Sequence, residues 1–256
     1  MGQTTISIGP LFAALLVLLV AIGATVAWVG RLGEGRAVVT ASARAVLQLA
    51  AVSLVIAAVL RSWWTTAGFI ALMTGVAAGT SARRVSSLRH GWAAAFPILA
   101  GVLPVGALIL LAHPMPMTPV AVLPTAGILI GGAMTATSLA GRRALDELRD
   151  RHGEYEAALA LGFFARDAAL LVCRPTAGRA LVPALDQTRT VGLVTLPGAF
   201  VGVMLGGGSA VQAGATQLLV LVALLAVEAI AVTLAVELVA AGVLRRGPAG
   251  TIPHGG

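Results

Sequence analysis

The sequence has no lysine, one cysteine and few charged side chains, and each shortage excludes a class of protein. All 17 basic residues are arginine, which excludes a P-loop with its phosphate-binding lysine and a Schiff-base enzyme. The chain therefore cannot be a conventional ATPase. Cys173 allows no internal disulfide and no cysteine-based zinc site, and we expect it to fill space as a small apolar side chain. Because the sequence also lacks HExxH, CxxC and nucleophile-elbow motifs, we expect no catalysis, no metal site and no bound cofactor in this chain.

What the sequence has instead is apolar length. Of its 256 residues 58% are hydrophobic and 11% are charged, whereas soluble domains have about a quarter of their residues charged. The net charge of +7 is no sign of nucleic-acid binding, because aromatics are only 4% and the arginines lie between hydrophobic blocks. This composition predicts an integral membrane protein.

Seven apolar blocks approach the roughly 20 residues that a helix needs to cross a bilayer. They cover residues 8–30, 37–60, 65–82, 92–112, 118–140, 190–208 and 217–243. We therefore predict an all-α, polytopic membrane protein with about seven transmembrane helices, forming one domain over residues 1–256. With the N-terminus outside the cell membrane and the C-terminus in the cytoplasm, Arg61 is the only arginine on the outer side and Arg44 lies within a span.

A polar segment, residues 141–189, separates the fifth and sixth predicted spans. Its apolar residues recur at helical spacing, as the run Leu145, Leu148, Tyr155, Leu159 and Phe163 shows. This pattern predicts a cytoplasmic amphipathic helix. Periodicity alone leaves open whether such a helix lies on the lipid surface or docks on another protein.

The segment also contains "EAALALG", in which EAA is followed by three residues and a glycine, with a proline further on. This spacing resembles the EAA loop of bacterial ABC importer permeases, a helix-turn-helix whose coupling helix docks on the ATPase. The matching positions are Glu156, Ala157, Ala158, Gly162, Val172 and Pro175. Arg174 stands where the pattern has leucine. We expect the two alanines to allow close approach of another chain, Gly162 to permit a tight reversal and Pro175 to fix a helix end.

Three further stretches resemble the FetB/YbbM-like family of ABC transporter permeases. They are "SARAVLQL" (42–49), "LPTAGILIGGAM" (123–134) and "TRTVGLVTLPGAFVG" (188–202). The resemblance implies a homodimer that pairs with a separate ATP-binding subunit, which holds ATP and Mg²⁺. It also implies metal-ion handling, chiefly iron export, with distant plant members associated with aluminium tolerance. Gly132 replaces an expected asparagine, and Ala199 and Phe200 replace paired methionines, so potential metal ligands are missing.

Polar and helix-breaking residues within the predicted spans are candidates for the transport pathway. They are Arg44, Gln48, Pro124, Gly127, Gly131, Pro197, Gly198 and Glu228. Arg44 could pair with Glu228 across helices, or extend its side chain to the cytoplasmic interface. The two prolines could line the pathway, or only kink their helices.

Two hypotheses of function follow, with a non-transporting membrane scaffold as a weaker third. The leading one is the permease subunit of an ABC transporter, exporting a metal ion of the iron type and coupled to its ATPase through residues 156–175. The alternative is a proton-coupled secondary transporter that uses Glu228 and Arg44 as its relay.

Overall fold

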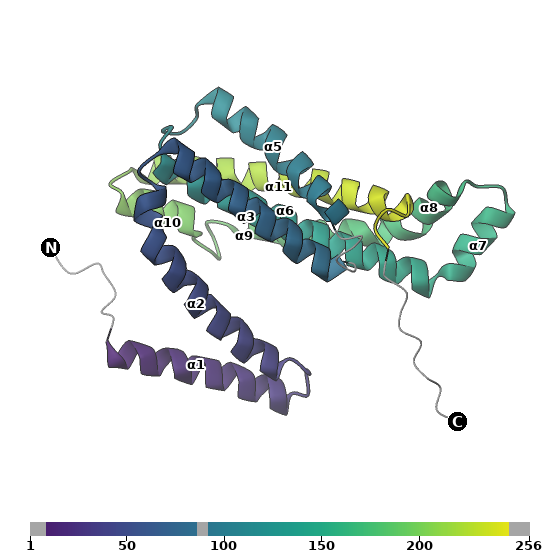
Figure 1. Ribbon diagram of the computed structural model, residues 1–256, viewed down its shortest axis with the longest axis horizontal. Coiled ribbons are helices and arrows are strands. Elements are labelled where there is room, and N and C mark those ends of the chain that lie inside the picture. The colour runs from purple at the N-terminus through teal and green to yellow at the C-terminus, as the bar shows by residue number, and fades with distance from the viewer. Residues whose placement is uncertain (1–8, 86–91, 246–256) are drawn as a thin grey trace. The chain divides into compact units, whose positions relative to one another are not determined.

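The computed structural model describes residues 9–85 and 92–245, and the chain divides into two compact units, Met1–Arg61 and Ser62–Gly256. Within the described ranges the elements are helices, joined by turns and one isolated bridge between Val191 and Thr195 (Figure 1). The prediction of an all-α protein is confirmed.

The first unit is a pair of helices, α1 (Pro10–Val29) and α2 (Gly35–Val59). Pro10 starts α1, where its fixed φ suits a helix and its missing N–H costs nothing. Past the intervening turn, a Cβ on Gly35 would lie 3.2 Å from the carbonyl oxygen of Ala24, so the glycine lets the two helices approach closely. These helices match the first two predicted spans.

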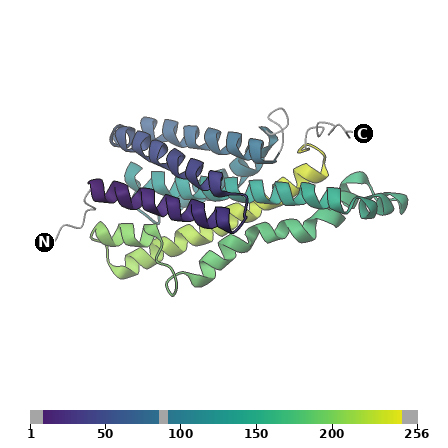
Figure 2. The same cartoon turned by 90° about the horizontal axis from the view of Figure 1, so that it is seen from below.

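The second unit contains the remaining helices. In chain order they are α3 (Trp63–Val85), η1 (Trp92–Ala94), α5 (Ala95–Ala112), α6 (Pro119–Asp150), α7 (His152–Ala160), α8 (Ala165–Ala177), η2 (Gly178–Leu181), α9 (Val182–Thr190), α10 (Gly198–Leu205) and α11 (Ala210–Ala240). The long helices α6 and α11 pack against each other, α3 and α5 also contact α6, and α8 contacts both α6 and α11. In Figure 2 the blue α3 and the green α8 and α9 lie on opposite sides of α6.

Small residues hold this second unit together. A Cβ on Gly132 of α6 would lie 2.2 Å from Cδ1 of Leu224 in α11, so this contact requires glycine. Between α6 and α3, the buried hydroxyl of Ser138 donates to that of Ser81 at 3.0 Å. Cys173 is buried among these helices with 0% exposure, as expected of a small apolar side chain.

Six helical stretches among the described residues are long and apolar enough to cross a membrane. They are Pro10–Val29, Gly35–Val59, Trp92–Ala112, Pro119–Asp150, Ala165–Thr190 and Ala210–Ala240. Five of them coincide with predicted spans. The predicted count of seven is not confirmed, because the third predicted span lies in the less apolar α3 and the sixth is not one helix.

The prediction of a single span over residues 190–208 was wrong. α9 ends at Thr190, a turn follows, and α10 has only 8 residues, about 12 Å of helix. The turn contains Gly192 at a φ of +83° and ends at Pro197, which caps α10. These two residues interrupt a run that is apolar throughout.

The predicted cytoplasmic segment 141–189 is also not confirmed as one surface segment. It includes the end of α6, then α7, α8, η2 and α9, and its second half lies in one of the six apolar stretches. One face of α8 is fully buried, since Ala168, Cys173 and Ala177 are 0% exposed, and the charged side chains of the helix lie on the other face. The apolar period from Leu145 to Phe163 does not form one helix as predicted, because α6 ends at Asp150 and α7 starts at His152.

Candidate functional site

The candidate site is the α7–α8 hairpin, which we define as residues 151–177. It extends from the end of α6, at the right of Figure 1. α6 ends at Asp150, and Arg151 is the cap residue of both α6 and α7. The Nη1 atom of Arg151 lies 3.2 Å from Oε1 of Glu147, and its guanidinium also donates to the carboxylate of Glu154. This arginine bridges the break between the two helices.

The charges around this break affect local titration. The hydrogen bond from Arg151 lowers the pKa of the exposed Glu154 below its ordinary value of 4.5. The same bond, with that to Glu147, raises the pKa of Arg151. Arg143 makes no ion pair with Glu147, and its Nη1 atom is buried without a hydrogen-bond partner within the described residues.

The turn after α7 depends on Gly162. Its φ is +93°, a region that glycine enters at little cost. The N–H of Gly162 donates to the carbonyl of Leu159 at 2.9 Å, and the N–H of Phe163 donates to that of Ala158 at 3.1 Å. These two bonds form a Schellman motif, which reverses the chain before α8 begins. The predicted tight reversal is present in the structure.

The tip of the hairpin exposes apolar side chains. Leu161 is 80% and Phe164 82% exposed, and Phe163 is 48% exposed. With Gly162 and Asp167 they line a shallow hollow of about 280 Å³. Such a surface can contact another macromolecule through apolar burial. The EAA pattern does not include Leu161 and Phe164, although the two phenylalanines that follow Gly162 in "GFF" are a signal for an exposed apolar tip.

The EAA residues do not all face outward. Glu156 and Ala157 are exposed, and Glu156 lies 3.4 Å from Nδ1 of His152. Ala158 is only 4% exposed, so it packs within its own chain and offers no surface to another, contrary to the prediction. Its small side chain instead lets α7 fold against α8.

The second half of the EAA pattern lies within α8. Val172 is 2% exposed and belongs to the packed face. Pro175 lies inside the helix, two residues before its end at Ala177, and the chain continues as the short helix η2. Pro175 therefore does not end the helix as predicted, and the change from α to 3-10 geometry comes at Gly178.

Arg174, at the position where the pattern has leucine, turns toward α11. Its Nη2 atom lies 3.0 Å from Oε1 of Glu237, and Nη2 of Arg166 lies 2.5 Å from Oε2 of the same carboxylate. Arg166 also contacts Asp167 at 3.1 Å. The substitution exchanges an apolar side chain for an ionic link between α8 and α11.

The buried carboxyl group of Glu228 lies against α6, the helix that carries Pro124, Gly127 and Gly131. Glu228 is 8% exposed in α11, and its Oε1 atom lies 2.8 Å from the place of a Cβ on Gly132. Gly131 adjoins that contact in α6, and Gly127 and Pro124 lie further back along the same helix. The glycine in place of asparagine therefore leaves room for the buried carboxyl group.

The other candidates lie apart from this group. Pro197 precedes α10 as its cap and Gly198 is the first residue of that helix, so Pro197 does not bend a helix as predicted. Arg44 and Gln48 are on α2 and are exposed within the first unit. Because Arg44 and Glu228 belong to different units, their pairing stays a prediction.

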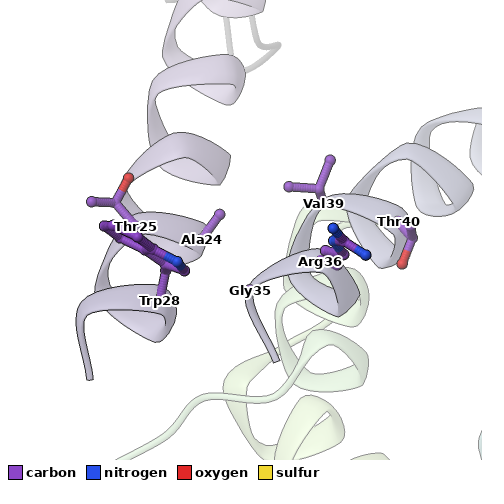
Figure 3. A pocket seen from close by; sticks show the side chains of 7 residues that line it. All are labelled: Ala24, Thr25, Trp28, Gly35, Arg36, Val39 and Thr40. Atoms are coloured by element: carbon purple, nitrogen blue, oxygen red, sulfur yellow. The ribbon is translucent and has the colours of Figure 1, made fainter. Parts of the chain in front are cut away.

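The first unit has a cavity of its own. A hollow of about 490 Å³ lies between α1 and α2 near their connecting turn, with Trp28 on α1 and Arg36 on α2 among its lining residues (Figure 3). Neither Arg44 nor Gln48 lines it. In the described parts of the chain, no group of three or more His, Cys, Asp or Glu side chains is placed to hold a metal ion.

The apolar helices define a multi-pass membrane protein with an exposed hairpin, and the comparisons place it in a family. The chain belongs to the uncharacterised protein family UPF0014, whose family model matches residues 11–244. It is 34% identical over 207 residues to "UPF0014 membrane protein STAR2" of rice, covering 79% of this chain and 72% of that protein. It is 33% identical to "Protein ALUMINUM SENSITIVE 3" of Arabidopsis thaliana, covering 73% and 70%.

A bacterial relative confirms the family resemblance seen in the sequence. The chain is 31% identical over 133 residues to "Probable iron export permease protein FetB" of Escherichia coli, covering half of each chain. The name of this relative describes an iron export permease, and other relatives are named as membrane proteins of the same family. No solved structure matches the chain.

Proposed function

We propose that this chain is the membrane-spanning permease subunit of an ABC transporter that exports a metal ion of the iron type. ATP and Mg²⁺ would bind to a separate ATP-binding subunit. The observation that carries this proposal is the α7–α8 hairpin. Gly162 fixes its turn, the tip exposes Leu161 and Phe164, and the EAA spacing of coupling helices covers the same residues.

The chemistry of the tip supports docking on a protein. Two large apolar side chains that are 80% and 82% exposed are costly in water, and a groove on a partner would remove them from it. The Schellman turn holds them in one arrangement, so little conformational entropy is lost on docking. A rigid, apolar tip is what a mechanical contact with an ATPase requires.

A revised topology accompanies this proposal. We infer seven crossings, with α3 as the third and the continuous run α8–α9 as the sixth in place of residues 190–208. With the N-terminus outside and the C-terminus cytoplasmic, the α7–α8 turn is cytoplasmic and only Arg61 and Arg189 lie at outer helix ends, in keeping with the positive-inside rule. The proposed assembly has two copies of this chain and two ATP-binding subunits.

The relatives support the class of substrate. One is named for iron export and another for sensitivity to aluminium. Both names concern metal cations. A permease moves its cation through transient contacts, so the missing cluster of protein ligands in the described residues is compatible with a transported ion.

The docking surface can be tested with the variant Phe164→Glu. Phe164 is 82% exposed, so the change should not affect folding, but a buried aromatic anchor is worth about 2 kcal/mol or more, roughly a 30-fold loss of binding. We expect the tagged variant to lose co-purification with an ATP-binding subunit expressed from the same genome. Leu193→Glu is the matched control, since Leu193 is 92% exposed in the turn between α9 and α10. Equal recovery of the ATPase with wild type and Phe164→Glu would contradict the proposal.

A second candidate function is proton-coupled transport without ATP. The observation that favours it is the buried Glu228, whose carboxyl group has no hydrogen-bond or ion-pair partner within residues 62–85 and 92–245. An intramembrane carboxyl group of this kind is a usual proton carrier. This alternative predicts metal-ion flux in proteoliposomes that hold this chain alone and a pH gradient. It also predicts that Glu228→Gln abolishes that flux.

A further inference from the structure

The carboxylate of Glu237 receives two arginines from a different helix. Its two oxygens are each used once, Oε2 by Arg166 at 2.5 Å and Oε1 by Arg174 at 3.0 Å. Glu237 lies in the last turn of α11, and the two arginines lie two turns apart on α8. We call these three residues the Glu237 clamp.

The clamp differs from the other ion pairs of the hairpin region. Arg151 with Glu154, and Arg189 with Asp186, join residues three apart within one stretch of chain. The partners in the clamp are 71 and 63 residues apart in sequence. Local pairs support a helix, whereas the clamp fixes one helix against another.

The clamp also lies along α8, and Arg166 is only two residues beyond Phe164 at the tip of the hairpin. α8 leads from the exposed tip into the bundle, where Leu170 and Cys173 on its inner face are buried. The arginines extend from the edge of the same helix to α11. A displacement of the tip therefore reaches α11 through two charge-assisted contacts as well as through apolar packing.

The stability of the fold does not depend on these contacts. The side chains of Arg166 and Arg174 are 53% and 63% exposed, and that of Glu237 is 26% exposed. Arg166 at the start of α8 and Glu237 in the last turn of α11 lie at helix ends that the proposed topology puts at the cytoplasmic surface, where water screens an ion pair and its contribution to folding is small. The geometry of the clamp still matters for movement, since a carboxylate held by two guanidinium groups restricts sliding of one helix along the other.

We propose that Arg166, Arg174 and Glu237 are positioning residues that transmit movement of the α7–α8 hairpin to α11. This inference rests on the proposed function. α11 also carries Glu228, nine residues before Glu237 and so about 13.5 Å along the helix axis. A shift of the last turn of α11 thus reaches the buried centre of the second unit through a rigid element.

The inference also explains the departure from the EAA pattern. A leucine at position 174 could hold α8 only by non-directional packing, whereas the arginine specifies one register against Glu237. The ionic contact therefore takes the place of the apolar one at the point where the hairpin meets the bundle.

The test uses the full-length chain with its ATP-binding subunit in proteoliposomes, with Fe²⁺ as the probe. The readout is the number of ions moved per ATP hydrolysed. We expect Glu237→Gln to lower this ratio about fivefold, the size expected for one or two partly exposed ion pairs, while ATPase binding is unchanged. Asp186→Asn, which removes a local pair in α9, is the matched control and should leave the ratio unchanged.

Charge exchange distinguishes a positioning role from a general structural one. In an Arg166→Gln background, Arg174→Glu and Glu237→Arg should each lower the ratio, and the two together should restore it. Two results would overturn the proposed role of the Glu237 clamp while the proposed function stands. One is that the charge exchange does not restore the number of ions moved per ATP, and the other is that Glu237→Gln leaves that number at the wild-type value. If the wild-type chain and its ATP-binding subunit together show no ATP-driven ion flux, both the proposed function and the proposed role of the Glu237 clamp are overturned.

A second measurement needs no ATPase. Spin labels on cysteines introduced at the exposed positions Leu171 of α8 and Thr233 of α11 report the distance between the helices, and the 0% exposure of Cys173 keeps its thiol away from the label. We expect Glu237→Gln to broaden the distance distribution in the permease alone. An unchanged distribution would show that α8 is held without the clamp and would overturn the inference.

Discussion

Replacing Gly162 with alanine should loosen the tip of the α7–α8 hairpin without unfolding the protein. The residue has a φ of +93°, and nothing lies within 4 Å of the position that a Cβ would take. The cost is therefore backbone strain alone. For an L-residue held in the left-handed region this strain is about 1–2 kcal/mol.

The strain acts on a small part of the molecule. Relieving it requires breaking the hydrogen bonds from Gly162 to Leu159 and from Phe163 to Ala158, which end α7. A cost of about 1–2 kcal/mol raises the population of the open hairpin about 5- to 30-fold. The amides of α7 should exchange with deuterium faster by the same factor, and those of α11 should not change.

Hydrogen exchange followed by mass spectrometry, with the protein in detergent, measures this directly. Gly153→Ala is the matched control, because Gly153 lies in α7 with open space around its Cβ position. Alanine there stabilises the helix by up to about 1 kcal/mol, so exchange in α7 should slow. If the α7 amides of Gly162→Ala exchanged at the wild-type rate, the conclusion that the turn requires glycine at position 162 would be refuted. In the proposed transporter the same variant should uncouple ATP hydrolysis from transport while insertion into the membrane is normal.

Two further predictions concern packing and charge. Gly132→Ala places a Cβ 2.2 Å from Cδ1 of Leu224 and should destabilise the bundle by about 1–3 kcal/mol in thermal unfolding, whereas Gly131→Ala, with open space, should not. Because the pKa of Glu154 is lowered in the folded protein, its ion pair stabilises α7 above pH 4.5 and is lost as the pH falls through the folded pKa. The protection of the α7 amides relative to their intrinsic exchange rate at each pH should therefore fall on acidification, and Arg151→Gln should remove that fall.

The sequence predicted the long apolar helices well because a bilayer imposes a simple rule of length and hydropathy. α1, α2, α5, α6 and α11 coincide with five predicted spans. The rule failed over residues 190–208, where hydropathy is high but Gly192 and Pro197 break the helix. The mean hydropathy of a segment contains no information about its backbone conformation.

The rule failed in the opposite sense over residues 165–190. The charges of this stretch suggested a surface segment, but they gather on one face of α8 while Ala168 and Cys173 on the other are fully buried. An amphipathic helix has the same period whether its apolar face meets lipid, a partner or its own bundle. Only packing distinguishes these cases.

Part of the candidate site could be predicted from the sequence. The EAA spacing identified Gly162, because a glycine after a helix has a local conformational reason that sequence carries. It did not show that Ala158 faces inward or that Leu161 and Phe164 form the exposed tip. Those facts depend on the angle at which α7 returns to α8, which is a tertiary property.

By itself the sequence determined that this is a lysine-free, helical membrane protein with a tight turn at Gly162, since composition, apolar length and turn residues act locally. The tertiary structure alone decided what Arg174 does. Its partner Glu237 is 63 residues away, and no pattern along the chain connects the two. The packing of α8 against α11 brings them to 3.0 Å, because side-chain contacts between distant segments are set by the fold and not by spacing in sequence.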